Sequence, residues 1–274
     1  MRLLPLFAYL AALALFALPS RAAAIEDGAE MPLQLRYDFA DTSGQSVPDV
    51  SGHGRNGVVT GKARIAPIPG ATAPRRNALD NTAAVMGSAT GGTGGSVRYA
   101  GAGWGPQKAF TVTMWFRTSP GQPLAQGTRL WELHGIAPKH LLLGINQGRL
   151  TVNLGDRSLL SHTTPRPLLQ ETDKWVFVAF AYDGTYERDN LRLFIGSETD
   201  PVQAAAIGTT AEPLWAKPAG KVELVVGSNT ANGRALSGWI DDVRVYSHDN
   251  ETTGALVLSE CQTVLDERAV SSTR

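Results

Sequence analysis

Short segments in which apolar and polar residues alternate recur along the chain, and Gly, Pro or Asn residues separate them. Alternation over roughly four to eight residues, rich in β-branched and aromatic side chains, is typical of a strand with one buried face. The pattern is clearest at residues 33–39, 110–117, 140–145, 149–154, 175–182, 191–195, 222–226 and 239–246. We expect each of these segments to form a β-strand.

The separations between neighbouring segments predict two hairpins. Residues 146–148 (NQG) join the third segment to the fourth, and residues 183–190 (DGTYERDN) join the fifth to the sixth. No stretch of about ten residues or more carries the apolar stripe of 3.6-residue period that predicts an amphipathic helix. The pattern therefore predicts an all-β fold, a two-sheet antiparallel β-sandwich of the jelly-roll type.

The breaks in the pattern are short, which bears on the number of domains. A Pro-rich stretch at 67–74 and a Gly-rich stretch at 87–95 are typical of loops. Neither separates two segments that could each close a core. We therefore predict a single domain over residues 25–274, with its core at 33–246 and a C-terminal tail.

The N-terminus has the pattern of a targeting segment. Arg2 precedes an apolar run at 3–18, and small residues follow up to Ala24. This is the layout of a secretory signal peptide over residues 1–24, cut after Ala22 or Ala24. An uncleaved anchor is the alternative, although the run is shorter than the roughly 20 residues that span a bilayer. We expect a secreted, periplasmic or extracellular protein with no membrane span after cleavage.

Composition excludes several classes of protein. Lys+Arg is 25 and Asp+Glu is 25, so no basic excess favours binding to nucleic acid. A single cysteine, Cys261, excludes an intramolecular disulfide framework and a Cys-rich zinc site. Hydrophobic residues make up 43% of the chain and charged residues 18%, which is enough apolar material for a sizeable core.

Blocks of sequence in a fixed order carry a family resemblance. They are residues 37–44 (YDFADTSG), 49–57 (DVSGHGRNG), 110–115 (FTVTMW), 175–184 (WVFVAFAYDG) and 238–246 (GWIDDVRVY). With this order and spacing, residues 33–246 resemble the LamG-like jelly-roll family (laminin G, concanavalin A-like lectin/glucanase). The resemblance implies a concanavalin A-like sandwich, in a family that includes both binding modules and glucanases.

The resemblance also implies a structural calcium ion between the N-terminal turn and the last strand. The candidate ligands are Asp41, Asp49, the carbonyl of His53, and Asp241. Strand alternation places Asp241 on the same face as Val243 and Val245, where a carboxylate is costly unless it meets a cation or hydrogen-bond donors. The alternative is that these carboxylates accept hydrogen bonds from turn amides.

Candidate catalytic residues are sparse. A retaining glycosidase needs two carboxyl groups about 5–5.5 Å apart. The nearest pairs, Glu187 with Asp189 and Glu198 with Asp200, lie in turn-like stretches, and the strand residue Glu132 has no acidic neighbour. The chain also lacks Gly-x-Ser-x-Gly and Ser-x-x-Lys. We therefore expect a protein that is not an enzyme, with a glycoside hydrolase as the less favoured alternative.

Aromatic residues supply the candidate binding site. Trp115, Trp175 and Trp239 lie within predicted strands and are assigned to the core. The candidate ligand contacts are Trp104 and Trp215 on Gly- and Pro-rich loops, Tyr186 at a hairpin tip, and Trp131. The sequence predicts a secreted, non-catalytic module that binds a polysaccharide or cell-surface glycan. The alternative is a protein-interaction or envelope-structural domain whose partner is an extracellular or envelope protein.

Overall fold

The computed structural model describes residues 31–40, 42, 44–69, 77–85, 94–102, 104–120, 127–136, 139–163, 174–216, 220–249 and 251–271. The chain divides into two units, Met1–Glu30 and Met31–Arg274, and all described residues belong to the second. The predicted signal peptide lies outside the described residues, so it stays a prediction. None of the helices in the described ranges has the length and apolar character needed to cross a membrane.

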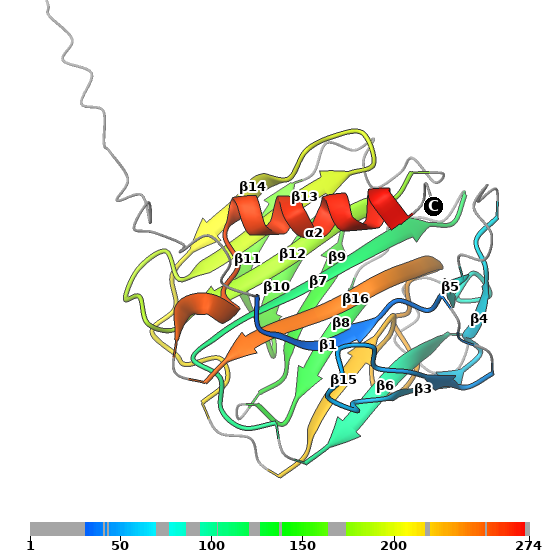
Figure 1. Ribbon diagram of the computed structural model, residues 1–274, viewed down its shortest axis with the longest axis horizontal. Coiled ribbons are helices and arrows are strands. Elements are labelled where there is room, and N and C mark those ends of the chain that lie inside the picture. Colours follow the sequence, from blue (N-terminus) through cyan, green and yellow to red (C-terminus); the bar gives the residue numbers. More distant parts are fainter. Residues whose placement is uncertain are drawn as a thin grey trace, which may run out of the picture. The chain divides into compact units, whose positions relative to one another are not determined.

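The described strands form two antiparallel sheets, which confirms the predicted sandwich (Figure 1). Sheet A has the order β14 (Gln203–Gly208), β13 (Leu191–Ser197), β12 (Val176–Asp183), β7 (Ala109–Thr118), β16 (Gly238–His248), β5 (Asn77–Asp80) and β4 (Arg64–Pro67), and β1 (Leu33–Tyr37) also pairs with β16. Sheet B has the order β11 (Arg157–Thr163), β10 (Arg149–Leu154), β9 (Leu141–Asn146), β8 (Thr128–His134), β15 (Val222–Val226), β6 (Gly95–Gly101), β3 (Gly57–Gly61) and β2 (Ser46–Val47).

Both predicted hairpins are present. Strands β9 and β10 pair from Asn146 opposite Arg149, and the two-residue turn between them has φ values of 52° at Gln147 and 76° at Gly148. Positive φ at both central residues matches the right-handed twist of the flanking strands. Strands β12 and β13 pair on either side of the second predicted turn.

The main core fills the space between the two sheets, and a second apolar layer covers the outer face of sheet A. Along β12, Val176, Val178 and Phe180 belong to the main core. The alternate residues Phe177 and Ala179 belong to the second layer. Because both faces of this strand are buried, its sequence reads as a nearly continuous apolar run.

The second layer is completed by helix α2 (Leu258–Ser271), which lies across β12 and β13 in Figure 1. It is preceded by a short 3-10 helix, η1 (Thr252–Gly254). The expectation of no helix of about ten residues or more was wrong, because α2 has 14 residues. Its buried stripe is Cys261, Val264 and Leu265, and the next position of the stripe is the charged residue Arg268, which obscured the 3.6-residue period.

A β-bulge in β16 changes which face its carboxylates occupy. Asp241 pairs with Trp115 and Arg244 with Thr113, so β16 has one extra residue in this interval, and φ is 45° at Asp242. The extra residue interrupts strict alternation. Contrary to the sequence prediction, Asp241 therefore faces Arg268 of α2 on the outer side of sheet A, whereas Val243 and Val245 face the main core.

Candidate ligand pocket

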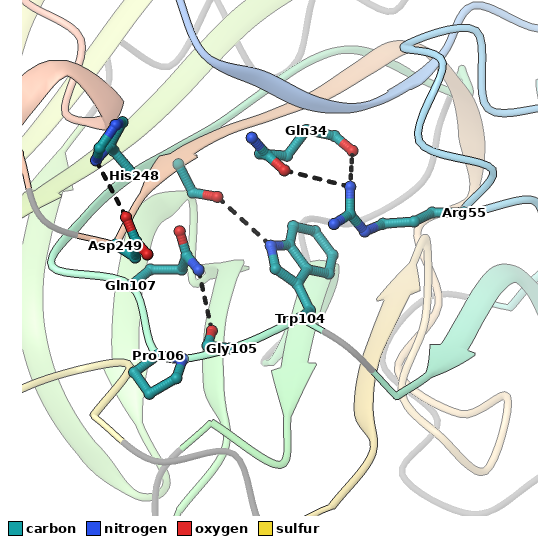
Figure 2. Close-up of a pocket in the computed structure, with 9 residues that line it drawn as sticks. Gln34, Arg55, Trp104, Gly105, Pro106, Gln107, His248 and Asp249 are labelled. Carbon is teal, nitrogen blue, oxygen red and sulfur yellow. Dashed lines mark hydrogen bonds and ion pairs between the residues drawn. The ribbon is translucent and has the colours of Figure 1, made fainter.

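A pocket of about 580 Å³ opens where four separate segments meet (Figure 2). The segments are β1, the turn after β2, residues 104–107 and the end of β16. The lining residues are Gln34, Arg55, Trp104, Gly105, Pro106, Gln107, Ser247, His248 and Asp249. The pocket therefore combines one indole ring with several hydrogen-bonding side chains.

One wall of the pocket is built from Arg55 and Trp104. The guanidinium carbon of Arg55 lies 4.7 Å from the centroid of the Trp104 ring, within the range of a cation–π interaction. Arg55 Nη1 donates to the carbonyl oxygen of Gln34, and Trp104 Nε1 lies 3.4 Å from Ser247 Oγ. The indole also packs against Trp215, with ring centroids 5.0 Å apart. These contacts fix both side chains.

Asp49 orders the turn that presents Arg55. Its Oδ1 accepts hydrogen bonds from the backbone N–H of Arg36 and from the N–H and hydroxyl of Ser51, and its Oδ2 accepts from the N–H of Arg55 at 2.9 Å. Burial alone would raise the pKa of Asp49, but these hydrogen bonds outweigh it and hold the pKa below its usual value. The carboxylate therefore stays ionised and holds the turn.

Tyr37 holds the same turn through a hydrogen bond from its side chain. Its hydroxyl donates to the carbonyl oxygen of Arg55 at 2.7 Å. Burial raises the pKa of Tyr37 further above its usual range, so the phenol keeps the proton that it donates. The backbone of Arg55 is thus bonded through both its N–H and its carbonyl group.

The opposite wall of the pocket carries amide, imidazole and carboxylate groups. Gln107 Nε2 donates to the carbonyl oxygen of Gly105 at 3.0 Å, and His248 Nδ1 lies 3.4 Å from Asp249 Oδ1. Figure 2 shows Arg55 on one side of Trp104, the groups of this second wall on the other, and Gln34 above the indole ring. The pocket thus has a cationic side and a side rich in hydrogen-bond acceptors.

The structure places the four predicted ligand-contacting aromatic residues in different environments. Trp104 lines the pocket, although its exposed fraction is only 2%. Tyr186 is exposed at the tip of the β12–β13 hairpin, beneath the guanidinium of Arg192. Trp131 and Trp215, with exposed fractions of 0% and 1%, are buried in the main core and are not among the residues that line the pocket.

Packing explains the two buried rings. Trp215 packs between Trp104 and Phe110, and its ring centroid lies 5.3 Å from that of Phe110. Trp131 packs against Phe180 across the two sheets. A loop tryptophan that folds back over the core cannot be distinguished by sequence from one that faces solvent.

The tryptophans predicted to serve packing lie on the outer face of sheet A. Trp115 and Trp175 are buried, and Trp239 is partly buried against the same layer. The Arg268 guanidinium carbon lies 4.4 Å from the Trp115 ring and 4.6 Å from the Trp175 ring. Trp115 and Trp175 therefore hold the C-terminal helix against the sheet through Arg268.

The predicted calcium ligands, as far as they are described, make hydrogen bonds to other groups of the chain. Asp41 lies outside the described residues. Asp49 already accepts hydrogen bonds from Ser51 and from the N–H of Arg55. Asp241 accepts from the N–H of Asp242 at 2.8 Å and from Arg268 Nε at 3.1 Å, while His53 Nε2 contacts the carbonyl oxygen of Leu33. Within the described ranges, no three His, Cys, Asp or Glu residues form a group that could hold a metal ion. Calcium binding stays a prediction, and we derive no function from it.

Glu132 also has partners that the sequence did not predict. Its Oε1 accepts from Arg129 Nε at 2.8 Å, and its Oε2 lies 2.9 Å from His134 Nε2. Burial acts to raise the pKa of Glu132, but His134 and Arg129 lower it more, so the net shift is downward. A low pKa is unsuitable for a general acid, which needs a proton near neutral pH.

Sequence reasoning missed six of the polar side chains that line the pocket: Gln34, Arg55, Gln107, Ser247, His248 and Asp249. No local motif unites them, because they come from distant parts of the chain. The only available signal was the turn at 49–57, which we singled out as a possible cation site. In the structure this turn places the guanidinium of Arg55 in the pocket lining.

The sandwich defines a class of protein, the concanavalin A-like fold. The sequence profile of the concanavalin A-like lectin/glucanases superfamily, of laminin G type, matches residues 91–251, which is more than half of the chain. The chain therefore belongs to this family. A comparison with curated protein sequences finds no match.

Solved structures with the same fold include carbohydrate- and receptor-binding domains. Domain 4 of AbnA, a GH43 extracellular arabinanase from Geobacillus stearothermophilus solved with arabinotriose, has a TM-score of 0.55 and 17% identity, covering 86% of this chain and 99% of that one. Botulinum neurotoxin type C, whose cell entry depends on interaction with two ganglioside molecules, has a TM-score of 0.56 and 13% identity. The binding domain of botulinum neurotoxin DC, solved with rat synaptotagmin II, has a TM-score of 0.57 and 13% identity. This chain spans 51% of each toxin chain, and the low identities show a shared fold alone.

Proposed function

We propose that this chain is a non-catalytic binding module that recognises carbohydrate through the pocket around Arg55 and Trp104. The observation that carries the proposal is the composition of the pocket. A fixed guanidinium–indole pair faces amide and carboxylate groups across a hollow of about 580 Å³. Sugars need several donors and acceptors at fixed positions, and binding sites combine such groups with apolar surface.

Relatives in fold support carbohydrate as the ligand. The AbnA domain is solved with arabinotriose, and the type C neurotoxin interacts with gangliosides. The DC neurotoxin domain is solved with synaptotagmin II, so a protein partner is the alternative. The non-catalytic assignment rests on Glu132, whose carboxylate is bound by Arg129 and His134.

We also propose that residues 1–24 act as a signal peptide and direct the protein out of the cytoplasm. The support is the order of a short positive start, an apolar run and small residues in the sequence. A secreted or periplasmic location would bring the module into contact with polysaccharides and cell-surface glycans. N-terminal sequencing of the exported protein tests the cleavage site, and an intact Met1 would overturn it.

Binding to a panel of polysaccharides and cell-wall fractions by residues 25–274 tests the carbohydrate proposal. We expect saturable binding to one class of glycan, and a change in tryptophan emission because Trp104 lines the pocket. Replacement Gln107→Ala should weaken binding about tenfold, the effect of losing one or two hydrogen bonds. Tyr186→Ala is the matched control, because this aromatic residue is exposed but lies outside the pocket.

The outcomes separate the alternatives. Loss of binding in Tyr186→Ala with no loss in Gln107→Ala would move the site to the hairpin tip. Binding to no glycan would overturn the carbohydrate proposal and favour a protein partner. The release of reducing sugars from any bound glycan would overturn the non-catalytic assignment.

A further inference from the structure

The guanidinium of Arg55 is held along one edge only. Its Nη1 contacts the carbonyl oxygen and the side-chain Oε1 of Gln34. Its Nε and Nη2 form no hydrogen bond with any residue in the described ranges. The stack on Trp104 fixes the plane of the group, so the second edge is presented in a set orientation.

Arg55 has no carboxylate partner within the described ranges, a property that it shares with Arg98, Arg149 and Arg192. The described arginines that do pair with a carboxylate within 4.0 Å are Arg36, Arg64, Arg129, Arg157, Arg244 and Arg268. No such ion pair includes Arg55 among the residues that the structure describes, and Asp49 accepts from its backbone N–H rather than from its side chain. A fixed cation without an anion therefore lines the pocket.

The opposite wall does not neutralise this cation. Asp249 is the acidic residue of the lining, and its side chain is 66% exposed beside His248. Figure 2 shows both residues across the Trp104 ring from Arg55. A ligand that spans the pocket would meet a positive group at one end and acceptors for hydroxyl groups at the other.

We propose that the pocket recognises an acidic glycan through the carboxylate of a sugar ring, which pairs with Nε and Nη2 of Arg55. This inference rests on the proposed carbohydrate function and names its substrate class. The guanidinium presents two parallel N–H groups, and this fork matches the two oxygens of a carboxylate. Gln107 and Asp249 then receive the hydroxyl groups of the same or the neighbouring sugar.

The test compares acidic polysaccharides with neutral forms of the same backbones. Polygalacturonate, alginate and hyaluronan are each measured beside a preparation in which the carboxyl groups have been reduced to alcohols. We expect one acidic polymer to bind residues 25–274 at least about tenfold more tightly than its reduced form, the effect of one charge-assisted pair. Dextran sulfate measures the response to charge alone and should bind more weakly than that polymer.

Variants assign the preference to Arg55. Arg55→Gln should reduce binding of the acidic polymer to the level of its reduced form, and Arg55→Lys, which lacks the fork, should restore only part of it. Arg157→Gln removes an equal charge from β11, outside the pocket, and should leave binding unchanged. Melting curves of all three variants show whether they remain folded.

The outcomes distinguish failure of the acidic-sugar inference from failure of the proposed carbohydrate function. Equal binding of acidic and reduced polymers, or binding of neutral glycans alone, overturns the acidic-sugar inference and leaves the carbohydrate function intact. A preference for acidic polymers that survives in folded Arg55→Gln also overturns it. Binding to no polymer, acidic or neutral, overturns the proposed function itself.

Discussion

At the scale of single residues, the carboxylate of Asp49 holds the turn that contains Arg55 in place by accepting hydrogen bonds. It gathers the N–H groups of Arg36, Ser51 and Arg55 around two oxygens and so fixes a turn rich in glycine. The position of one wall of the pocket depends on this turn, because Arg55 belongs to the turn and also lines the pocket. Asp49 therefore links the stability of the turn to the shape of the pocket.

Asp49→Asn should lower stability and binding together. The replacement puts an amide N–H₂ in place of one acceptor oxygen, and a lost hydrogen bond to a charged group costs about 1.5–3 kcal/mol. Urea denaturation gives the free energy of unfolding, and glycan titration gives the affinity. Asp156→Asn, at an exposed position, is the control and should change stability by less than about 0.5 kcal/mol. A variant that loses neither property would show that the turn orders itself without Asp49.

The lowered pKa of Glu132 makes the free energy of unfolding depend on pH. Because its pKa is lower in the folded chain than in the unfolded chain, its ion pairs contribute fully above the unfolded pKa. The contribution is lost as the pH falls through the lower, folded pKa. Glu132→Gln should therefore melt well below the wild type at pH 7, and the difference should shrink below about pH 4. Parallel melting curves that keep a constant separation down to pH 2 would contradict this.

At the scale of elements, α2 is bound to sheet A by charge as well as by apolar contact. Arg268 pairs with Asp241 and Glu267 pairs with Arg244, and both partners lie on β16. Trp115 and Trp175 flank the Arg268 guanidinium, which is 5% exposed. These polar contacts add to the apolar stripe of Cys261, Val264 and Leu265 among the described side chains of the helix.

Arg268→Ala should be strongly destabilising. It leaves the buried carboxylate of Asp241 without its cation, and breaking a buried pair in this way costs about 3–5 kcal/mol. Thr263→Ala, on the exposed side of the same helix, should cost less than about 0.5 kcal/mol. Chemical denaturation of both variants makes the comparison. Equal small losses would mean that α2 adds little to the stability of the sandwich.

The same elements show what a sequence can and cannot predict. Strands such as β7, β10 and β12 were predictable, because a period of two or an apolar run is a property of neighbouring residues. The bulge at Asp242 was not, since an extra residue leaves no mark on composition, and it moved Asp241 to the other face of the sheet. Helix α2 was missed because an arginine continues its apolar stripe and is buried by stacking.

At the scale of the whole molecule, the pocket exists only because distant segments converge. Gln34 and Asp249, both lining residues, lie near opposite ends of the described chain. Alternation predicts strands but not which strands become neighbours, so no pattern along the chain could place these residues together. The order of sheet A supplies that information, since β1 pairs with β16.

Removal of divalent metal ions tests the remaining calcium prediction. If the predicted calcium ion is bound, the melting temperature should be lower in EDTA than in excess calcium, and equal melting temperatures would contradict the prediction. The measurement is a thermal melt of residues 25–274 in each buffer. A lower melting temperature in EDTA would show that a calcium site exists, and Asp41→Ala would then be the first variant to make.

The pairing of β1 with β16 also sets the order of events during synthesis. Strand β16 lies beside β1 in Figure 1 and bonds to β5 and β7 as well, yet it is the last strand to leave the ribosome. Until it emerges, β7 and β1 have no connection within sheet A. Contacts between residues so far apart in sequence make folding slow. Sheet A therefore cannot be completed before β16 has been made, and a variant truncated before Gly238 should not fold.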